Sequence, residues 1–276
     1  MRIDPLKVVG EILGEPAAEM RNPVNADYQC PFLNSTCTKT SHWIDGPFPV
    51  CTVHYGGRTK ATTSRPMCVC PNRFYSIDLM GDIIKHCWPP GPPPTNPHIA
   101  HEVKMADFGN VDMVIADIDE VSGNVKAFAS VELQAVDITG SYEPAYQGVL
   151  NSSPEVLVSY GMNWKNVRKR FILQLIDKGI YHYHWGTRII AVVQTPLYEN
   201  LHRAIQWEEL PPDRGGNTVI FMLYDYRPDP DRPGAYVLGL DRVVGTSHSS
   251  LMTASLYQPV PSKEVFHQKI LANLER

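Results

Sequence analysis

The sequence lacks several features that would assign it to a common class. It has no uninterrupted run of about 18 apolar residues, which a membrane-spanning helix needs. Its first residues, Met1 to Pro5, lack the apolar segment of a secretion signal, so we expect a soluble, cytoplasmic protein that does not enter a membrane. There is no phosphate-binding glycine loop, dinucleotide fingerprint, HExxH helix or G-x-S-x-G turn, which excludes the enzyme classes built on these motifs.

Cysteine is absent from the last two thirds of the chain, because all six cysteines lie between residues 30 and 87. In the reducing compartment expected for a chain without a secretion signal, metal binding explains such a cluster better than disulfides do. Cys30, Cys37, Cys51 and Cys70 can supply four thiolates to a closed tetrahedral site, with Cys68 as a competing ligand. The alternative is that these thiols are buried and pack as small apolar side chains.

The chain also lacks the positive net charge typical of nucleic-acid-binding proteins, since its formal charge is -4. Local clustering matters more than this total, because acidic metal ligands lower the sum without removing a basic face. The one dense basic cluster is Lys165, Arg168, Lys169 and Arg170, near the start of a predicted helix. We interpret it as a phosphate-contacting surface, and a merely solvated helix face is an equal alternative.

Proline and hydrophobic periodicity divide the chain. Residues 1–75 are rich in Pro, Cys, Thr and Asn with little periodicity, which predicts a loop-rich unit held together by something other than a hydrophobic core. Apolar residues at near-helical spacing predict a short amphipathic helix over 74–88. The proline run that follows is a stiff spacer. We therefore predict a four-cysteine unit with a connecting helix over 1–88, a linker over 89–97 and a second domain over 98–276.

The second domain has the pattern of an α/β fold. Apolar, β-branched segments at 111–118 and 125–138 flank turn-forming residues, which predicts a β-hairpin. Helical periodicity covers 166–184, with Asn163 or Asn166 available as its N-cap. The remaining predicted elements are strands over 188–194, 219–225 and 235–244 and a C-terminal helix over 263–274.

The sharpest catalytic candidates lie on this hairpin. Glu132 and Gln134 project to one face of their strand, because residues two apart share a face. Asp112 on the first strand can come alongside Glu132, and two adjacent carboxylates favour a cation between them. Mg²⁺ held in this way can activate a phosphodiester towards water. Glu102 is a possible further ligand or base; the alternative is that all these groups are ordinary surface residues.

Several segments together resemble the NotI restriction endonuclease family. The matching segments are Cys30-Pro31-Phe32-Leu33, Cys70-Pro71-Asn72-Arg73, the positions of Cys37 and Cys51, the strand and turn over 131–142, and the helix start at 166–170. The resemblance implies a PD-(D/E)XK restriction-endonuclease-like core, a central mixed sheet flanked by helices, with a small N-terminal four-cysteine metal-binding unit. It implies iron as the metal of the cysteine site, although thiolates bind zinc as well.

The same resemblance assigns roles in the acidic site. Asp112 and Glu132 are implied Mg²⁺ ligands, with the carbonyl of Leu133 as a third contact and Glu102 as an extra acid. Gln134 stands where most of the superfamily has lysine. Because an amide cannot exchange a proton near neutral pH, Gln134 can only orient the attacking water.

The resemblance implies a type II restriction endonuclease that is Mg²⁺-dependent and acts as a homodimer on a palindromic, G/C-rich site in double-stranded DNA. Two alternatives stay open. One is a non-catalytic DNA-binding module, from which Mg²⁺-dependent cleavage of a plasmid would distinguish an enzyme. The other is a nuclease of DNA repair or of another defence system.

Overall fold

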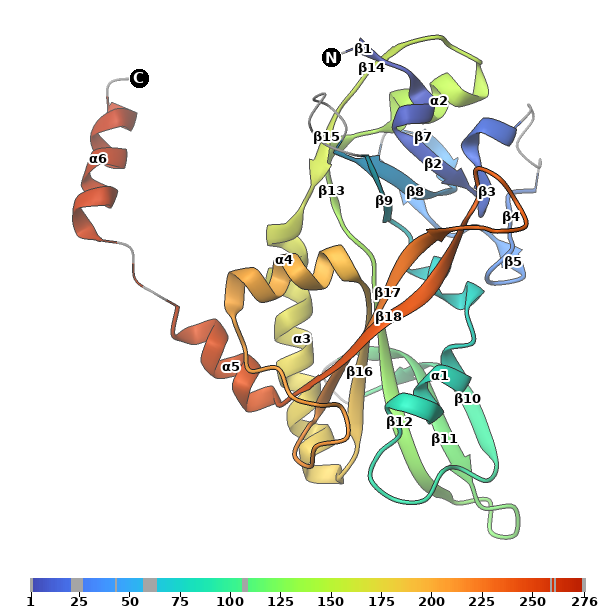
Figure 1. Ribbon diagram of the computed structural model, residues 1–276, viewed down its shortest axis with the longest axis vertical. Coiled ribbons are helices and arrows are strands. Elements are labelled where there is room, and N and C mark those ends of the chain that lie inside the picture. Colours follow the sequence, from blue (N-terminus) through green and yellow to red (C-terminus); the bar gives the residue numbers. More distant parts are fainter. Residues whose placement is uncertain are drawn as a thin grey trace.

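A six-stranded mixed sheet forms the centre of the molecule (Figure 1). The computed structural model describes residues 2–20, 27–42, 44–56, 64–105, 109–258, 260 and 262–274. In spatial order the strands are β10 (Pro97–Lys104), β11 (Asn110–Ile118), β12 (Val125–Gln134), β16 (Arg188–Gln194), β17 (Val219–Pro228) and β18 (Tyr236–Thr246). The strands β12, β16 and β17 are parallel, and the other neighbouring pairs are antiparallel.

Helices cover both faces of this sheet, because alternate residues of β16 are apolar on both faces and pack in two separate cores. Ile189, Ala191 and Val193 pack in one core with α3 (Trp164–Trp185) and α4 (Thr195–Ile205). Ile190 and Val192 pack in the opposite core with α1 (Leu79–His86). A strand buried on both faces needs a continuous apolar run, which is what β16 has. The predicted α/β class and mixed sheet flanked by helices are thus confirmed.

The predicted hairpin and long helix are both present. The strands β11 and β12 pair in antiparallel fashion, and Asp119 stabilises their turn by accepting hydrogen bonds from the amides of Val121 and Ser122. Asn163 caps α3 by accepting a bond from the amide of Asn166, and Gly186 ends the helix with a φ of 66°. Of the two predicted caps, Asn163 is therefore the correct one.

The prediction that the first 75 residues lack a core is wrong. They form a four-stranded sheet of β3 (Glu15–Pro16), β2 (Val9–Ile12), β8 (Val50–Tyr55) and β9 (Arg65–Cys68). Its apolar residues pack in the same core as α2 (Glu143–Leu150) and α3. The strands have two to six residues and pair over long distances along the chain, so they leave little local periodicity.

Short ribbons and turns complete the upper part of the molecule. They are β1 (Arg2–Ile3) with β14 (Val156–Leu157), β4 (Gln29–Cys30) with β5 (Ser35–Thr36), β6 (Thr40–Ser41) with β7 (Ile44–Pro47), β13 (Ile138–Ser141) with β15 (Ser159–Met162), and the 3-10 turns η1 (Pro5–Lys7), η2 (Ala17–Glu19) and η3 (Pro71–Ser76).

The helix predicted over 74–88 is shorter than expected. It begins at Leu79, because the Asp78 side chain accepts a hydrogen bond from the Gly81 amide and caps the first turn. Residues 71–76 form η3 instead. Nearby, the backbone of Cys68 is bonded to the chain on both sides, through its amide to Gln194 Oε1 and through its carbonyl to the amide of Val136. The N-terminal sheet therefore lies over the carboxyl ends of the parallel strands.

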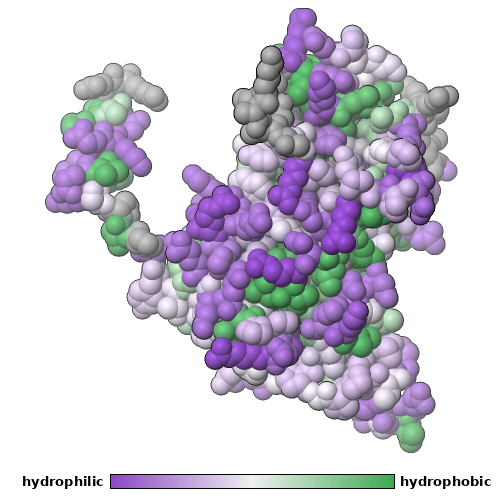
Figure 2. Space-filling model, viewed as in Figure 1, coloured by the Kyte–Doolittle hydropathy of each residue, from purple (hydrophilic) through white to green (hydrophobic). Residues whose placement is uncertain are grey.

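Two helices end the chain, α5 (His248–Leu256) and α6 (Lys263–Leu274). The helix α6 has the predicted bounds, buries no residue and extends away from the body (Figure 1). Apolar and polar side chains are mixed over its surface (Figure 2). Within the described ranges, no helix is both long and apolar enough to cross a membrane.

Candidate active site

Three carboxylates lie in one row across three neighbouring strands. On β10 and β11 the pairs His101 with Met113 and Val103 with Val111 place Glu102 opposite Asp112. On β11 and β12 the register ends at Met113 with Val131, and its continuation places Asp112 opposite Glu132. The side chains of Asp112 and Glu132, predicted to come together, thus lie on adjacent strands, with Glu102 beside them.

The strands β11 and β12 separate at this row. The last backbone-paired residues of these strands are Met113 and Val131. Beyond them, the Leu133 amide donates to a side chain in place of a backbone carbonyl, with 2.7 Å to Oδ2 of Asp112. Glu102 has a φ of 52°, a left-handed conformation that is unusual for a glutamate, and its Oε2 accepts a bond of 3.2 Å from the Asn110 side chain. Strain of this kind is common at functional sites.

Burial raises the affinity of these acids for protons. Glu132 is 6% exposed, and burial raises its pKa to about 7 against the opposing effect of the Lys178 ammonium. Burial also raises the pKa of Asp112, and Glu102 adds to that effect while the Leu133 amide opposes it. A divalent cation near these groups would compete with the proton for the carboxylates.

Lys178 is the site residue that the sequence analysis missed. It lies on α3 with a side chain that is 2% exposed, and its ammonium forms an ion pair with Oε1 of Glu132 and donates a bond of 2.7 Å to the Asn110 carbonyl. A signal was present in the sequence: Lys178 follows Phe171 by seven residues and Leu175 by three, so it falls on the apolar face of the helix. A charged residue at such a position needs a buried partner.

Gln134 is half-buried and lies on the same face of β12 as Glu132. Its Nε2 donates a bond of 2.5 Å to the carbonyl of Ala135. This bond uses one of the two N–H groups of the side-chain amide. The assigned role of Gln134, like that of the Leu133 carbonyl, stays a prediction.

A cleft of about 650 Å³ opens beside Asp112 and Glu102. One wall comes from β10, β11 and α1, and the other comes from the cysteine-rich segment through Phe32, Leu33 and Asn72. Tyr75 and His101 also line the cleft, with their ring centroids 5.7 Å apart. A ligand in the cleft would therefore touch both the acidic row and the residues that flank the cysteines.

The four cysteines chosen from the sequence lie near one another. A hydrogen bond from the Cys51 thiol lowers the pKa of Cys70 to about 6 and raises that of Cys51 well above its ordinary value. Burial raises the pKa of Cys37, and the neighbouring Cys70 and Cys30 raise it further. The buried ammonium of Lys39 lies close to Cys70 and Cys51 and bonds the hydroxyl of Tyr142 at 2.9 Å.

The two remaining cysteines are packed differently. Cys68 and Cys87 are buried in the core beneath α1, and burial raises the pKa of each thiol to about 12. The Sγ atom of Cys68 donates to the Cys70 carbonyl at 3.2 Å. Both therefore behave as small apolar side chains, the alternative considered for the whole set.

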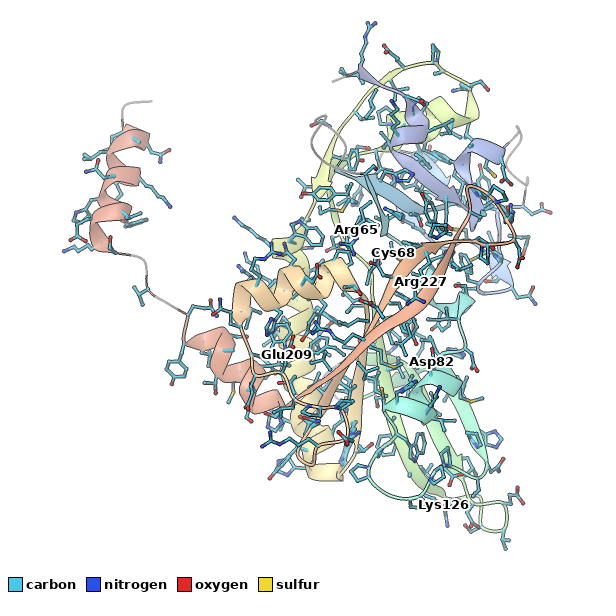
Figure 3. The ribbon with its side chains drawn as sticks, viewed as in Figure 1. Arg65, Cys68, Asp82, Lys126, Glu209 and Arg227 are labelled. Atoms are coloured by element: carbon cyan, nitrogen blue, oxygen red, sulfur yellow. The ribbon has the colours of Figure 1, made fainter. Side chains whose placement is uncertain are left out.

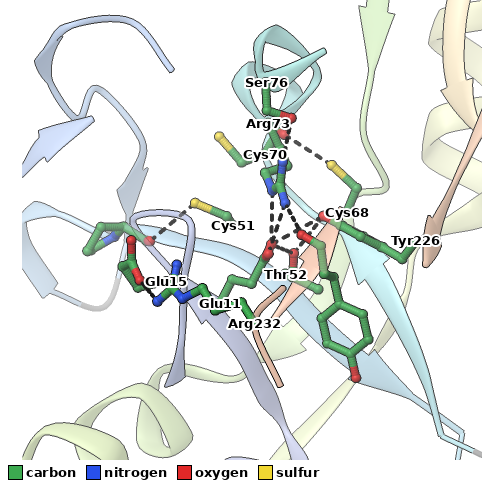
Figure 4. A network of polar contacts seen from close by, with 12 residues as sticks. Glu11, Glu15, Cys51, Thr52, Cys68, Cys70, Arg73, Ser76, Tyr226 and Arg232 are labelled. Atoms are coloured by element: carbon green, nitrogen blue, oxygen red, sulfur yellow. Dashed lines mark hydrogen bonds and ion pairs between the residues drawn. The ribbon is translucent and has the colours of Figure 1, made fainter. Parts of the chain in front are cut away.

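A buried ion pair joins this region to the central sheet (Figure 4). Arg73, which follows Cys70 in η3, bonds both carboxylate oxygens of Glu11 on β2, at 3.0 and 3.1 Å. It also donates to the carbonyl of Tyr236 on β18 at 2.8 Å. Tyr226 on β17 completes the network through Thr52, with 2.6 Å between their hydroxyl oxygens. Such a network holds together only when all its members are present.

In the described part of the chain, no three His, Cys, Asp or Glu side chains are arranged to hold a metal ion. The donor types nevertheless fit the predicted metals, because carboxylate oxygens suit Mg²⁺ and thiolates suit iron or zinc. In the acidic row, Lys178 pairs with Glu132, whereas neither Asp112 nor Glu102 forms an ion pair among the described residues, so acidic groups are in excess there.

The basic cluster lies outside the acidic cleft. Lys165, Lys169 and Arg170 are exposed and Arg168 is half-buried. Arg168 and Lys169 line a separate groove of about 570 Å³ between α3, α4 and α5, and Arg170 pairs with Asp137 at 3.0 Å. Other charged residues are spread over the surface, as the labelled Arg65, Lys126 and Glu209 show (Figure 3). The predicted phosphate contacts therefore belong to another part of the surface than the acids.

Most of the chain is similar to one known protein family. The family model described as restriction endonuclease NotI matches residues 11–238, a range that contains all the site residues above. No curated protein sequence matches the chain. The match defines a DNA-cleaving hydrolase that binds double-stranded DNA and cuts it at specific sites. The chain belongs to the NotI restriction endonuclease family, which confirms the resemblance seen in the sequence.

Proposed function

We propose that the protein is a Mg²⁺-dependent type II restriction endonuclease that hydrolyses double-stranded DNA at a palindromic, G/C-rich site. The observation that carries the proposal is the row of Glu102, Asp112 and Glu132, of which Glu102 and Asp112 line an open cleft and only Glu132 is paired with an ammonium. We also propose that the mixed sheet is a PD-(D/E)XK core and that the protein acts in the cytoplasm.

We propose separate roles for the residues of this site, namely cation binding and orientation of the attacking water. Asp112 and Glu132 would hold the cation, with the Leu133 carbonyl as a third ligand and Glu102 as an outer acid. When bound, Mg²⁺ polarises the phosphodiester and stabilises negative charge on the leaving oxygen. Gln134 orients the attacking water through its amide, since it can neither accept nor release a proton near neutral pH.

The cysteine region would hold a second metal. We propose that Cys30, Cys37, Cys51 and Cys70 bind one iron or zinc ion. The ion would fix the position of the segment whose Phe32 and Leu33 form one wall of the cleft. The proposal is supported by the electrostatic proximity of these four thiols and by the separate packing of Cys68 and Cys87. A closed site with four thiolates leaves no position for substrate, so its role is structural.

The chain would act as a homodimer. A palindrome has two-fold symmetry, which favours a two-fold enzyme. Phe266, Ile270 and Leu274 are exposed on α6, and their spacing of four residues places them along one face. The groove between α3, α4 and α5 is also apolar, with Leu173 and Leu256 among its exposed side chains. The α6 helices of two copies would pack against each other through the first of these surfaces, which leaves Arg168 and Lys169 in the groove open to DNA.

One experiment tests cleavage, specificity and cut position together. Purified protein is incubated with bacterial genomic DNA and Mg²⁺, and the ends produced are sequenced. The proposal expects ends that share one palindromic sequence and that disappear when Mg²⁺ is chelated. DNA that stays intact while the protein still binds it would contradict the proposal and favour a non-catalytic binding module. Ends without a common sequence would favour a repair-type nuclease.

A further inference from the structure

Lys178 bonds to both β11 and β12 at the point where the backbone hydrogen bonds between these strands end. Its ammonium bonds the carbonyl of Asn110 on β11 and the carboxylate of Glu132 on β12. The backbone ladder between these strands ends three residues beyond Asn110, at Met113. Lys178 is therefore the cross-link that α3 supplies where backbone pairing no longer fixes the distance between the strands.

The position of this lysine does not suit a purely stabilising role. Its side chain is 2% exposed, and taking both an ammonium and a carboxylate out of water has a large free-energy cost, which their attraction only partly recovers. Buried ion pairs are therefore weak sources of stability. The same burial keeps the ammonium away from any DNA in the cleft, so Lys178 must act through the groups that it holds.

We propose that Lys178 is a positioning residue that sets the distance between the carboxylates of Asp112 and Glu132 and so fits their site to a small divalent cation. The inference rests on the proposed Mg²⁺-dependent function. Lys178 holds Oε1 of Glu132 and leaves Oε2 available to a cation.

The selectivity between Mg²⁺ and Ca²⁺ tests this role. Mg²⁺ requires ligands at about 2.0–2.1 Å in a nearly octahedral arrangement, whereas Ca²⁺ accepts about 2.3–2.6 Å and looser geometry. Removing the ammonium changes the charge of the site equally for both ions, so the charge effect largely cancels in the ratio of their affinities. A change in that ratio therefore reports the geometry that Lys178 imposes.

The experiment uses the full-length, DNA-free protein with Mn²⁺ as an electron paramagnetic resonance probe, displaced by Mg²⁺ or by Ca²⁺. For Lys178→Met we expect the ratio of Mg²⁺ to Ca²⁺ affinity to fall about tenfold, because a loosened site no longer favours the smaller ion. The matched control is Lys7→Met, which removes an exposed lysine far from the site and leaves the ratio unchanged. Lys178→Arg keeps the positive charge but lengthens the tether, and it should lower the ratio as well.

Two failures can be told apart. If Asp112→Ala leaves Mn²⁺ binding unchanged, the acids do not form the cation site, and the proposed function fails together with this inference. If Asp112→Ala abolishes binding but a folded Lys178→Met binds with the parental ratio, only the inference fails. Should Lys178→Met not fold, Lys178→Arg decides the question, and a parental ratio in that variant overturns the positioning role.

Discussion

Asp112 takes the place of a backbone acceptor for Leu133, with 2.7 Å between its Oδ2 and the Leu133 amide nitrogen. This bond fixes one carboxylate oxygen at the point where β11 and β12 part, and it holds the amide of Leu133, the residue whose own carbonyl is a proposed cation ligand. The acid thus contributes to the shape of the site as well as to its charge.

Removal of charge from the acidic row should stop cleavage. We expect Asp112→Asn and Glu132→Gln each to lower the rate of plasmid cleavage at least about 1,000-fold, because each loses a charged ligand of the cation. Binding to DNA without Mg²⁺, measured by gel shift, should remain close to that of the parent. Glu120→Gln, which changes an exposed acid of the hairpin turn, is the control. Near-normal turnover of either site variant would show that the metal site is assigned wrongly.

The raised pKa of Glu132 predicts that Mg²⁺ binding depends on pH. At pH 6.5 the carboxyl, whose pKa is about 7, is largely protonated, so binding of the cation should release a proton. Affinity should therefore rise through pH 7 and level off about one pH unit above the pKa. Calorimetry of Mg²⁺ binding in two buffers of different ionisation enthalpy measures the proton, which should be absent in Glu132→Gln.

The raised pKa of Glu132 also makes the free energy of unfolding of the metal-free protein depend on pH. Between pH 4.5, the ordinary pKa of a glutamate, and about 7, the folded metal-free protein binds a proton on Glu132 that the unfolded chain has released. The contribution of Glu132 to the free energy of unfolding is thus present below this window and is lost as the pH rises through it. Urea denaturation should show this loss in the parent and not in Glu132→Gln. Equal slopes in both would contradict the assignment.

The cysteine site predicts a sharp division among alanine variants. Alanine at Cys30, Cys37, Cys51 or Cys70 should remove one equivalent of iron or zinc, measured by elemental analysis, and lower the melting temperature, because metal binding contributes directly to folding. Alanine at Cys68 or Cys87 should leave the metal bound, since both thiols pack beneath α1. A stable, metal-free parent would contradict the site, and loss of metal on Cys68→Ala but not on Cys70→Ala would show that the ligand set is wrong.

The basic cluster predicts a change in the salt dependence of DNA binding. Each phosphate contact contributes about 0.9 to the slope of log affinity against log salt concentration. Lys165→Ala with Lys169→Ala should thus reduce the slope by about 2 and weaken binding alike for all sequences. The paired control is Lys85→Ala with Lys7→Ala, which removes two exposed lysines elsewhere. An unchanged slope would make the cluster an ordinary solvated helix face.

The α6 helix predicts how the dimer can be broken. Replacing Phe266 and Ile270 by serine removes the apolar side chains through which the two copies would be in contact. Size-exclusion chromatography with light scattering should then show a monomer in place of a dimer. Serine at Glu264 and Gln268, which lie on the other side of the same helix, should leave the dimer intact. A monomeric parent, or a dimer that survives the first pair of changes, would rule out this interface.

Local sequence patterns predicted the parts of the fold that have long periodic segments. The hairpin, α3 and β16 follow from alternation and helical spacing that each segment carries by itself. The row of Glu102, Asp112 and Glu132 was only partly predictable, because the place of Glu102 depends on the register between β10 and β11. Lys178 was missed because its partner lies 46 residues away on another element.

The N-terminal strands share one hydrophobic core with α2 and α3, and this has a consequence for protein engineering. Exchanging residues 1–88 with those of a relative would not be a modular graft, because the incoming strands would meet a helix surface shaped by another partner. Such a chimera would need the matching residues of α2 and α3 as well, whereas the ion pair of Glu11 and Arg73 lies wholly within the exchanged segment. Changes in the residues on one side of that shared core therefore require compensating changes on the other side.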